Sequence, residues 1–323
     1  MSEFALIDRY FTRPTPGAVL GPGDDCALLA PTPGMELAVT TDMLVAGTHF
    51  FPDTDPRNLG WKALAVNISD LAAMGATPRW ATLAGSLPAA DEAWIAAFAE
   101  GFFACAGAFG VDVVGGDTTR GPLNLCITAI GEVAPGQALR RDGARLHDDI
   151  WVSGRPGLAG LGLAHLQGGV DLPEPWRRLC LAALEKPQPR VRLGLALCGI
   201  ANAAIDVSDG LLADLGHIAE RSGLAAAVRL VQLPHLPKGA TPEAIPRALA
   251  LDAQLAGGDD YELCFTAPTE QRLAIGKIAA DLELPLWCIG EMQAGPAGSV
   301  TVYDPDGQAI AFDRQGYDHF PGV

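Results

Sequence analysis

One strongly apolar stretch of the chain contains three polar residues, and it reads Ala63-Leu64-Ala65-Val66-Asn67-Ile68-Ser69-Asp70-Leu71-Ala72-Ala73-Met74. Alanine and leucine favour a helix here, in which Asn67, Ser69 and Asp70 would be largely buried. An ionised carboxylate is costly to bury unless it is paired or bound to a cation. Lys62 or Arg79 could neutralise Asp70, and a bound metal ion is the alternative.

Six further short acidic motifs follow apolar runs elsewhere in the chain. They are Gly23-Asp24-Asp25, Thr40-Thr41-Asp42, Gly115-Gly116-Asp117, Asp206-Val207-Ser208-Asp209, Gly257-Gly258-Asp259 and Asp260-Tyr261-Glu262. Most set a carboxylate beside a glycine or a hydroxyl at the expected end of a strand. Oxygen ligands of this kind suit hard cations such as Mg²⁺, which in turn bind phosphates. The motifs therefore predict metal-dependent phosphate chemistry.

Each motif taken alone has a structural interpretation as well. Asp24 and Asp25 could form an acidic turn without a ligand. Asp42, which follows an expected strand over residues 37–41, could equally cap the amino terminus of a helix. The number of such motifs, with few Lys or Arg residues nearby, favours binding of several cations.

Strand-like and helix-like segments alternate along the chain, which predicts a mixed α/β or α+β protein rather than a helical bundle or a β-sandwich. We expect helices over residues 56–75 and 91–109, with Asp91 as an N-cap. A segment rich in Pro, Gly, Arg and Asp over residues 134–149 is the expected domain boundary. It separates a domain of residues 1–140 from a domain of residues 141–323.

The composition limits the function further. The chain has 323 residues, 49% of them apolar, and its 38 acidic and 22 basic residues give a net charge of −16. Such a charge disfavours nucleic acid and anionic membranes as partners. The sequence lacks the phosphate-binding loop of P-loop enzymes, the protein-kinase motifs and a G-x-S-x-G nucleophile motif.

The cysteines and the amino terminus indicate where the protein works. Seven cysteines are scattered without a C-x-x-C pair, so we expect buried thiols rather than a zinc site. The opening residues lack the features of a signal peptide. No apolar run reaches the roughly 18 to 20 residues that span a bilayer. We therefore expect a reduced, cytoplasmic protein that does not enter a membrane.

Seven motifs, in their order along the chain, resemble those of the thiamine-monophosphate kinase family. They are Gly23-Asp24-Asp25-Cys26-Ala27, Thr41-Asp42, Gly47-Thr48-His49-Phe50, residues 67–75, Gly115-Gly116-Asp117-Thr118-Thr119, Ser208-Asp209-Gly210-Leu211 and Tyr317-Asp318-His319-Phe320. The resemblance runs from Phe4 to Phe320. It implies a two-domain fold shared with aminoimidazole ribonucleotide synthetase, with an N-terminal domain that binds ATP and Mg²⁺ and a C-terminal α/β domain that completes the active-site cleft. It also implies a homodimer formed through the N-terminal sheet.

The resemblance further implies ATP-dependent phosphorylation of thiamine phosphate to thiamine diphosphate, with several Mg²⁺ ions. The implied metal ligands are Asp25, Thr40, Thr41, Asp42, Asp70, Asp117, Asp206 and Asp209. The implied ATP contacts are Gly116, Asp117, Arg141 and Ser208. The implied contacts to thiamine are His49, Asp259 and Tyr317. The family pattern often has Glu where this chain has Asp259. The side chain of Asp259 is about one methylene shorter, which makes this assignment the weakest of the set.

The chemistry of two phosphates agrees with this expectation. Phosphoryl transfer needs positioning and charge neutralisation more than covalent chemistry. A phosphate oxygen of the substrate is already ionised near neutral pH, so we expect direct in-line attack on the γ-phosphorus. No side chain is then needed as a nucleophile or as a general base. On sequence alone, Arg141 could instead be a solvated charge, His49 a packed residue and Tyr317 a C-terminal anchor.

Two alternatives remain open at this stage. Another enzyme of the same fold is one, although the reactive Cys and Lys expected of selenophosphate synthetase are missing before Gly21, and aminoimidazole ribonucleotide synthetase does not explain residues 317–320. A nucleotide-binding maturation or scaffold protein that no longer turns over is the other. Loss of the metal-binding carboxylates would mark such a protein, and none is missing from the motifs.

Overall fold

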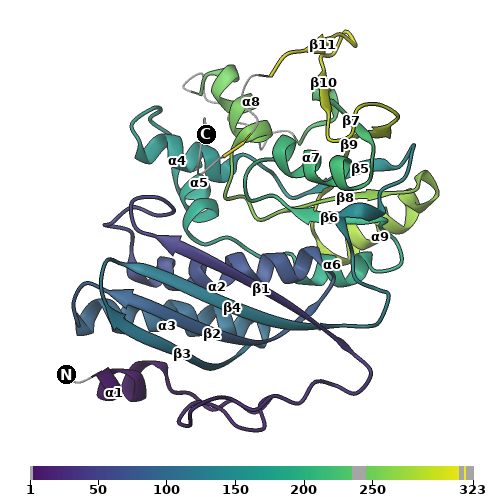
Figure 1. The fold of residues 1–323 in the computed structure, drawn as a ribbon. Coiled ribbons are helices and arrows are strands. Elements are labelled where there is room, and N and C mark those ends of the chain that lie inside the picture. The colour runs from purple at the N-terminus through teal and green to yellow at the C-terminus, as the bar shows by residue number, and fades with distance from the viewer. Residues whose placement is uncertain (1–2, 235–244, 313–315, 318–323) are drawn as a thin grey trace. The chain divides into compact units, whose positions relative to one another are not determined.

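The chain folds into two compact units, shown in Figure 1, in a computed structural model that describes residues 3–234, 245–312, 316 and 317. The N-terminal unit comprises Met1–Ala72 and Ala76–Ala138, and the C-terminal unit comprises Ala73–Gly75 and Leu139–Val323. The expectation of a mixed α/β fold is confirmed. A further helix predicted by the sequence around residues 242–253 and the motif 317–320 lie partly outside the described residues, at 242–244 and 318–320.

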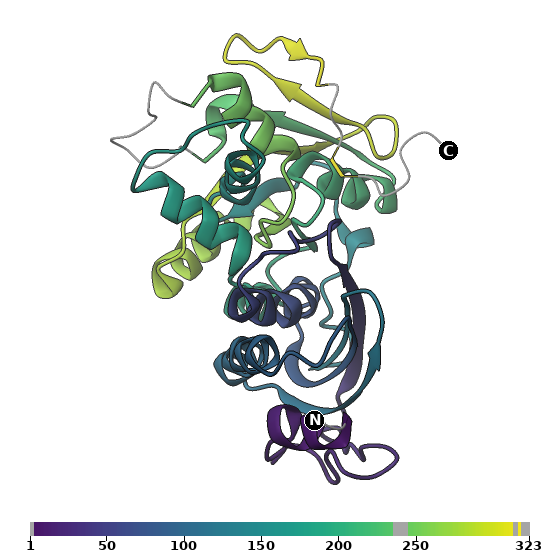
Figure 2. The same cartoon turned by 90° about the vertical axis from the view of Figure 1, so that its left-hand side faces the viewer.

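The N-terminal unit is a four-stranded sheet covered by two long helices. Its elements are α1 (Glu3–Leu6), the π-helical turn η1 (Ile7–Phe11), β1 (Glu36–Val45), α2 (Pro56–Ala73), β2 (Thr77–Leu87), α3 (Glu92–Phe109), β3 (Asp112–Arg120) and β4 (Asn124–Val133). The strand order is β1-β4-β2-β3, with β4 antiparallel to both neighbours and β2 parallel to β3. Figure 2 shows α2 and α3 on the same side of this sheet.

Helix α3 begins as its sequence predicts. The carboxylate of Asp91 accepts hydrogen bonds from the backbone N–H groups of Ala93 and Trp94, which confirms the N-cap. The helix is 18 residues long, and by length and composition alone it could cross a membrane, so the expectation that no segment reaches that length is wrong. One such helix is weak evidence for a membrane span, because the core helices of soluble proteins also have this length and composition. Phe98 and Phe102 of α3 are buried in this unit.

Two strands of this unit are longer than the sequence predicts. Asp42 was expected just beyond a strand end, but β1 continues to Val45, and Asp117 lies inside β3, which continues to Arg120. The reason is pairing with a neighbouring strand: β4 supplies partners for every residue of β1, and β2 pairs with β3 as far as Arg120. Tertiary pairing here outweighs the low strand propensity of Gly and Asp.

The C-terminal unit is a seven-stranded sheet with helices on both faces. Its strands are β5 (Asp149–Ser153), β6 (Ala203–Asp206), β7 (Ala225–Arg229), β8 (Leu263–Ala267), β9 (Leu286–Gln293), β10 (Val300–Tyr303) and β11 (Ala309–Ile310), in the order β11-β10-β7-β9-β5-β8-β6. Its α-helices are α4 (Leu158–Leu166), α5 (Trp176–Glu185), α6 (Val191–Leu197), α7 (Leu211–Arg221), α8 (Arg247–Ala256) and α9 (Arg272–Leu282). Short 3-10 turns are η2 (Arg141–Gly143), η3 (Leu230–Gln232) and η4 (Thr269–Gln271).

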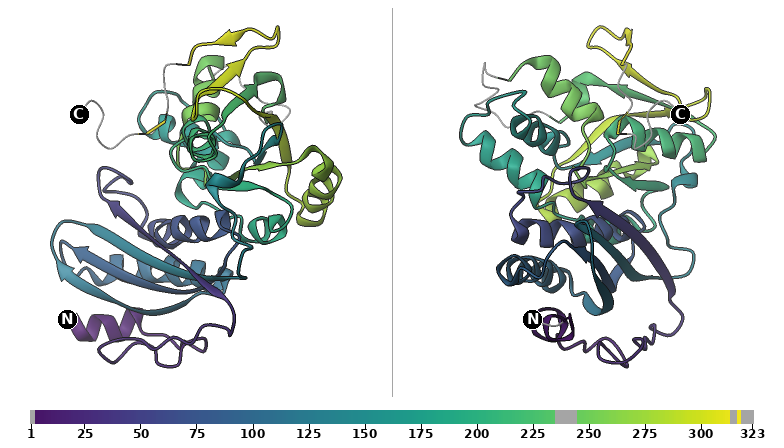
Figure 3. Two further views of the ribbon diagram at one scale, coloured as in Figure 1. Left: turned by 45° about the vertical axis from the view of Figure 1, so that its right-hand side comes forward. Right: turned by 60° about the vertical axis from the view of Figure 1, so that its left-hand side comes forward.

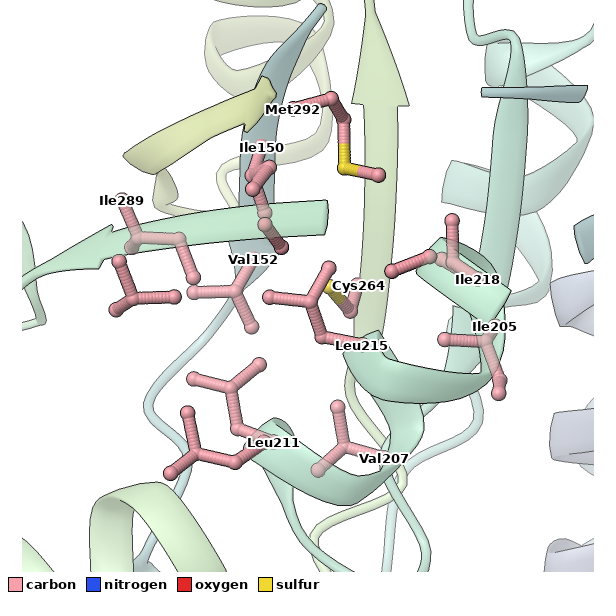
Figure 4. Close-up of a cluster of buried hydrophobic side chains, with 14 of the residues drawn as sticks. Ile150, Val152, Ile205, Val207, Leu211, Leu215, Ile218, Cys264, Ile289 and Met292 are labelled. Carbon is pink, nitrogen blue, oxygen red and sulfur yellow. The ribbon is translucent and has the colours of Figure 1, made fainter. Parts of the chain in front are cut away.

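Alternating side chains build a separate core on each face of this sheet. Ile150 and Val152 of β5 belong to a cluster that includes Leu215 of α7, as Figure 4 shows. Trp151 packs against the other cluster, which contains Phe265 of β8. Both faces of the central strands are therefore buried, which explains their nearly continuous apolar sequences.

Candidate functional site

In the N-terminal unit, β1 and α2 bring together three of the predicted metal ligands. The hydroxyl of Thr40 donates a hydrogen bond to the carboxylate of Asp70, and the backbone N–H of Asp42 donates to the amide oxygen of Asn67 at 3.0 Å. Alternation along the strand gives Thr40 and Asp42 the same face, toward α2. Thr41 points to the other face, where its hydroxyl lies 2.8 Å from that of Thr128.

The surroundings of Asp70 agree in part with the sequence analysis. Asn67 and Ser69 are fully buried, whereas Asp70 is only half-buried. Arg79, one of the two cations that could neutralise it, forms an ion pair with Glu132 at 3.5 Å.

A second group of predicted residues lines a cavity of about 730 Å³ in the same unit. The cavity lies between the N-terminal segment and strands β2 and β3, and Figure 3 shows that segment running beside the edge of the sheet. Asp25 and Asp117 line it together with Gly116, and both carboxylates are exposed. Gly116 has a φ of 154°, and a Cβ atom there would overlap the carbonyl oxygen of Leu83. Only glycine fits at this point of β3.

The strand order separates these two groups. Strands β1 and β3 are opposite edges of the four-stranded sheet, so Asp42 and Asp117 lie about 14 Å apart at a usual strand spacing of about 4.8 Å. In the part of the chain that the structure describes, no three Asp, Glu, His or Cys side chains form a ready-made metal site. Mg²⁺ commonly uses only one or two carboxylates and takes its other ligands from water and substrate phosphates.

Loops at one edge of the seven-stranded sheet bring together four predicted residues of the C-terminal unit. The backbone N–H of Asp259 donates to the carbonyl oxygen of Ser208 at 2.8 Å. The backbone N–H of Tyr317 donates to the carbonyl oxygen of Asp209 at 3.1 Å. Asp206, at the end of β6, is 3% exposed. We call the residues Ser208, Asp209, Asp259 and Tyr317 the loop cluster.

Backbone strain marks the second of these loops. Asp259 and Tyr261 have φ angles of 65° and 50°, in the left-handed region that residues other than glycine rarely adopt. The hydroxyl of Tyr261 donates to the carboxylate of Asp259 at 3.1 Å, and the N–H of Tyr261 donates to the carbonyl oxygen of Val207 at 2.8 Å. Strain of this kind persists where the surrounding structure enforces it, and it is frequent at functional sites.

Two acidic residues that the sequence analysis left without a role are structural. The carboxylate of Asp260 accepts hydrogen bonds from the N–H groups of Gly157 and Ala159 at the start of α4. Desolvation raises the pKa of Asp260 well above its ordinary value, although these donors act against it. Glu262 is buried, forms a bidentate ion pair with Arg190 and accepts a hydrogen bond from Ser153.

Sequence reasoning missed Asp214, which lies in the first turn of α7 and is 2% exposed. Its carboxylate accepts hydrogen bonds from the N–H groups of Ser208, Asp209 and Gly210. Burial and the negative charge of Asp209 raise its pKa to about 7, while the three donors lower it. A carboxylate inside the apolar run from Leu211 to Leu215 was the available signal, because the same argument had singled out Asp70.

Two other predicted residues, one in each unit, make hydrogen bonds with the backbone. His49 follows β1, and its Nδ1 accepts a hydrogen bond from the N–H of Val45 at 3.0 Å, which leaves Nε2 as the nitrogen that carries a proton. The carbonyl oxygen of Arg141 accepts a hydrogen bond from Ser222, which caps the carboxyl end of α7. Ser208 precedes the other end of that helix, so the structure does not bring Arg141 and Ser208 together.

Comparison with known proteins places the chain in a class and then in a family. Residues 23–133 match the model of the AIR synthase related protein, N-terminal domain, and residues 147–303 match that of the C-terminal domain. The thiamine-monophosphate kinases of Salmonella typhimurium and Escherichia coli (strain K12) are 46% and 45% identical to it, over 98% of this chain and 98% of each relative. The chain belongs to the thiamine-monophosphate kinase family.

Solved structures agree with this assignment. The thiamine-monophosphate kinase of Stenotrophomonas maltophilia K279a is 51% identical, with a TM-score of 0.85 over 96% of this chain and 98% of the other. A structure of AaThiL complexed with AMPPCP and TMP is 30% identical, with a TM-score of 0.75 over 90% of this chain and 89% of the other. The hydrogenase maturation protein HypE, at 22% identity and a TM-score of 0.79, shares the fold alone.

Proposed function

We propose that this protein phosphorylates thiamine phosphate to thiamine diphosphate with ATP, which is the last step of thiamine diphosphate biosynthesis. The observation that carries the proposal is 46% identity to a thiamine-monophosphate kinase over nearly the whole length of both chains. A relative of known structure binds AMPPCP and TMP at once, which fits a site for a nucleotide and a phosphorylated substrate together.

The geometry within each unit supports the proposed site residues. In the N-terminal unit, Gly116 and Asp117 line the cavity, and we assign them to ATP. In the C-terminal unit, the loop cluster joins Ser208, assigned to ATP, to Asp259 and Tyr317, assigned to the thiamine moiety. We also assign His49 to the thiamine moiety and Arg141 to an ATP phosphate.

The donor atoms fit Mg²⁺. The eight proposed ligands offer carboxylate and hydroxyl oxygens without a thiol or an imidazole, which is the set that hard cations prefer. They are Asp25, Thr40, Thr41, Asp42, Asp70, Asp117, Asp206 and Asp209. When bound, Mg²⁺ would neutralise the charge of the phosphates and stabilise the oxygens of the transferred phosphoryl group.

The proposed reaction is a direct in-line transfer. A phosphate oxygen of thiamine phosphate forms a bond to the γ-phosphorus of ATP, the bond from that phosphorus to the β,γ-bridging oxygen breaks, and ADP leaves. The proposed site residues bind and orient the two anions, and no side chain takes a proton or forms a covalent intermediate. Orientation of this kind is the main source of rate in phosphoryl transfer.

We further propose a cytoplasmic homodimer in which residues 1–140 bind ATP and Mg²⁺ and form the dimer contact. The outer face of β1 supports the dimer, because Leu37, Val39 and Met43 are each about half exposed or more, at 47%, 62% and 53%. Exposed apolar side chains in a row are typical of association surfaces.

The test is an assay of the purified protein with ATP, Mg²⁺ and thiamine phosphate, in which thiamine diphosphate is detected by chromatography after oxidation to a fluorescent product. We expect thiamine diphosphate to form when Mg²⁺ is present. Its formation should stop when the metal is chelated and resume when Mg²⁺ is restored. Absence of the product under all three conditions would contradict the proposal.

A further inference from the structure

Asp214 holds the backbone of a three-residue segment of the proposed site. One of its carboxylate oxygens, Oδ2, accepts hydrogen bonds from the N–H groups of Ser208, Asp209 and Gly210 at 3.0, 3.1 and 3.1 Å. The side chain is 2% exposed and belongs to the first turn of α7, a helix fixed in the core by Leu211 and Leu215. Three N–H donors that meet on one buried oxygen fix the position of the backbone that carries them.

The segment can present three successive N–H groups to one oxygen because of its shape. Gly210 has a φ of 129°, and a Cβ atom there would be about 3 Å from the backbone of Ala256 at the end of α8. The chain bends at Ser208 and Asp209, and the three N–H groups converge on one oxygen. One carboxylate oxygen of Asp214 therefore accepts from three consecutive residues of the segment.

The same segment carries the rest of the loop cluster on its carbonyl oxygens. Ser208 accepts a hydrogen bond from the N–H of Asp259, and Asp209 accepts one from the N–H of Tyr317. A shift of the segment would therefore move four proposed site residues together. Because Asp214 is buried and bonded to this backbone, we expect its influence to pass through the segment.

We propose that Asp214 is a positioning residue for phosphoryl transfer, which fixes the backbone at Ser208, Asp209 and Gly210 so that the loop cluster keeps a productive geometry. The inference rests on the proposed function. Removal of a residue that orients a metal ligand through a hydrogen bond commonly lowers metal affinity or activity by about 10- to 100-fold.

Two substitutions separate the roles of the carboxylate. Asp214→Ala removes the acceptor, and we expect kcat for thiamine diphosphate formation to fall about 100-fold. Asp214→Asn keeps an oxygen acceptor without the charge, and we expect a loss below about 10-fold. If the two variants lose activity equally, or if Asp214→Ala stays within about threefold of the unchanged protein, the positioning role is contradicted.

A matched control tests whether any buried carboxylate would have the same effect. Asp148 is 3% exposed in the same unit and accepts hydrogen bonds from Arg145, Asn202 and Thr266. Asp148→Ala should lower the melting temperature but keep kcat of the folded protein. An equal fall of kcat in Asp148→Ala and Asp214→Ala would mean that loss of stability alone explains the effect of Asp214. This result would overturn the proposal.

Hydrogen exchange makes the inference testable apart from the activity. In the full-length protein, amide protons of a peptide covering residues 207–211 should exchange faster in Asp214→Ala than in Asp148→Ala, measured by mass spectrometry where both variants are folded. Unchanged exchange in Asp214→Ala would contradict the positioning role. If the unchanged protein makes no thiamine diphosphate, the proposed function fails. Amide hydrogen exchange and calorimetric binding of Mg²⁺ and ATP would still report whether Asp214 holds the segment.

Discussion

At the scale of single residues, the acidic side chains divide by how their charge is satisfied. Asp214, Asp260 and Glu262 are enclosed by N–H donors or by an arginine. Asp25 and Asp117 are exposed on the wall of a cavity. A carboxylate with a full set of protein donors has little capacity left for a ligand, whereas an exposed one beside a cavity retains it. This difference separates Asp214, Asp260 and Glu262 from Asp25 and Asp117.

Neutralising a proposed metal ligand should stop turnover without unfolding the protein. For Asp117→Asn and Asp42→Asn we expect kcat to fall about 100-fold or more, because removal of one preorganised electrostatic contact to a transition state costs that much. Circular dichroism should remain unchanged. Asp306→Asn, at an exposed turn, is the control and should keep full activity. Near-normal rates in both ligand variants would exclude the assignment.

The position of Asp259 makes a prediction about substrate affinity. Asp259→Asn keeps the size of the side chain but loses its charge, and we expect KM for thiamine phosphate to rise about 10-fold, as for one lost charged hydrogen bond. Asp259→Glu keeps the charge and should change KM less. Steady-state kinetics with ATP held at saturation measures both. A larger effect on KM for ATP than for thiamine phosphate would contradict the assignment.

Sequence reasoning found part of this residue-level organisation. The polar residues in the apolar run 63–74 led directly to Asp70, and the structure places it against Thr40. Convergence of Ser208, Asp209, Asp259 and Tyr317 could not be predicted without the resemblance, because it depends on backbone hydrogen bonds between segments far apart in the chain. The role of Asp214 was missed for the same reason.

At the scale of elements, the ion pair at the start of α6 ties two segments of the C-terminal unit. Arg190→Met removes the guanidinium and leaves the carboxylate of Glu262 buried without its ion-pair partner. This should lower the free energy of unfolding by about 3–5 kcal/mol. Denaturant titration measures the loss. In the exposed pair Arg177–Glu174, Arg177→Met should cost less than about 1 kcal/mol. Equal losses in the two variants would contradict a stabilising role for the buried pair.

Element types were more predictable than element ends. Helix α3, expected over residues 91–109, spans Glu92–Phe109, because Asp91 caps its start. Strand β7, Ala225–Arg229, was missed, because alanine has no preference for strands and the segment is one only by pairing with β9 and β10. Asp42 and Asp117 were misplaced relative to strand ends for the corresponding reason.

At the scale of the whole molecule, the exposed face of β1 predicts association. Val39 is 62% exposed in a strand whose outer face is apolar, so Val39→Lys should weaken the proposed dimer. Light scattering should give about twice 33.6 kDa for the unchanged protein and a lower mass for this variant. Leu273→Lys, at a position 90% exposed on α9, is the control and should keep the dimer mass. A monomeric mass for the unchanged protein would contradict the dimer.

Transfer of one phosphoryl group from ATP to thiamine phosphate can be followed by phosphorus NMR of a single reaction mixture. With Mg²⁺ present, we expect the signals of thiamine phosphate and ATP to decline together while thiamine diphosphate and ADP appear in equal amounts. Release of ADP with inorganic phosphate and without thiamine diphosphate would contradict it.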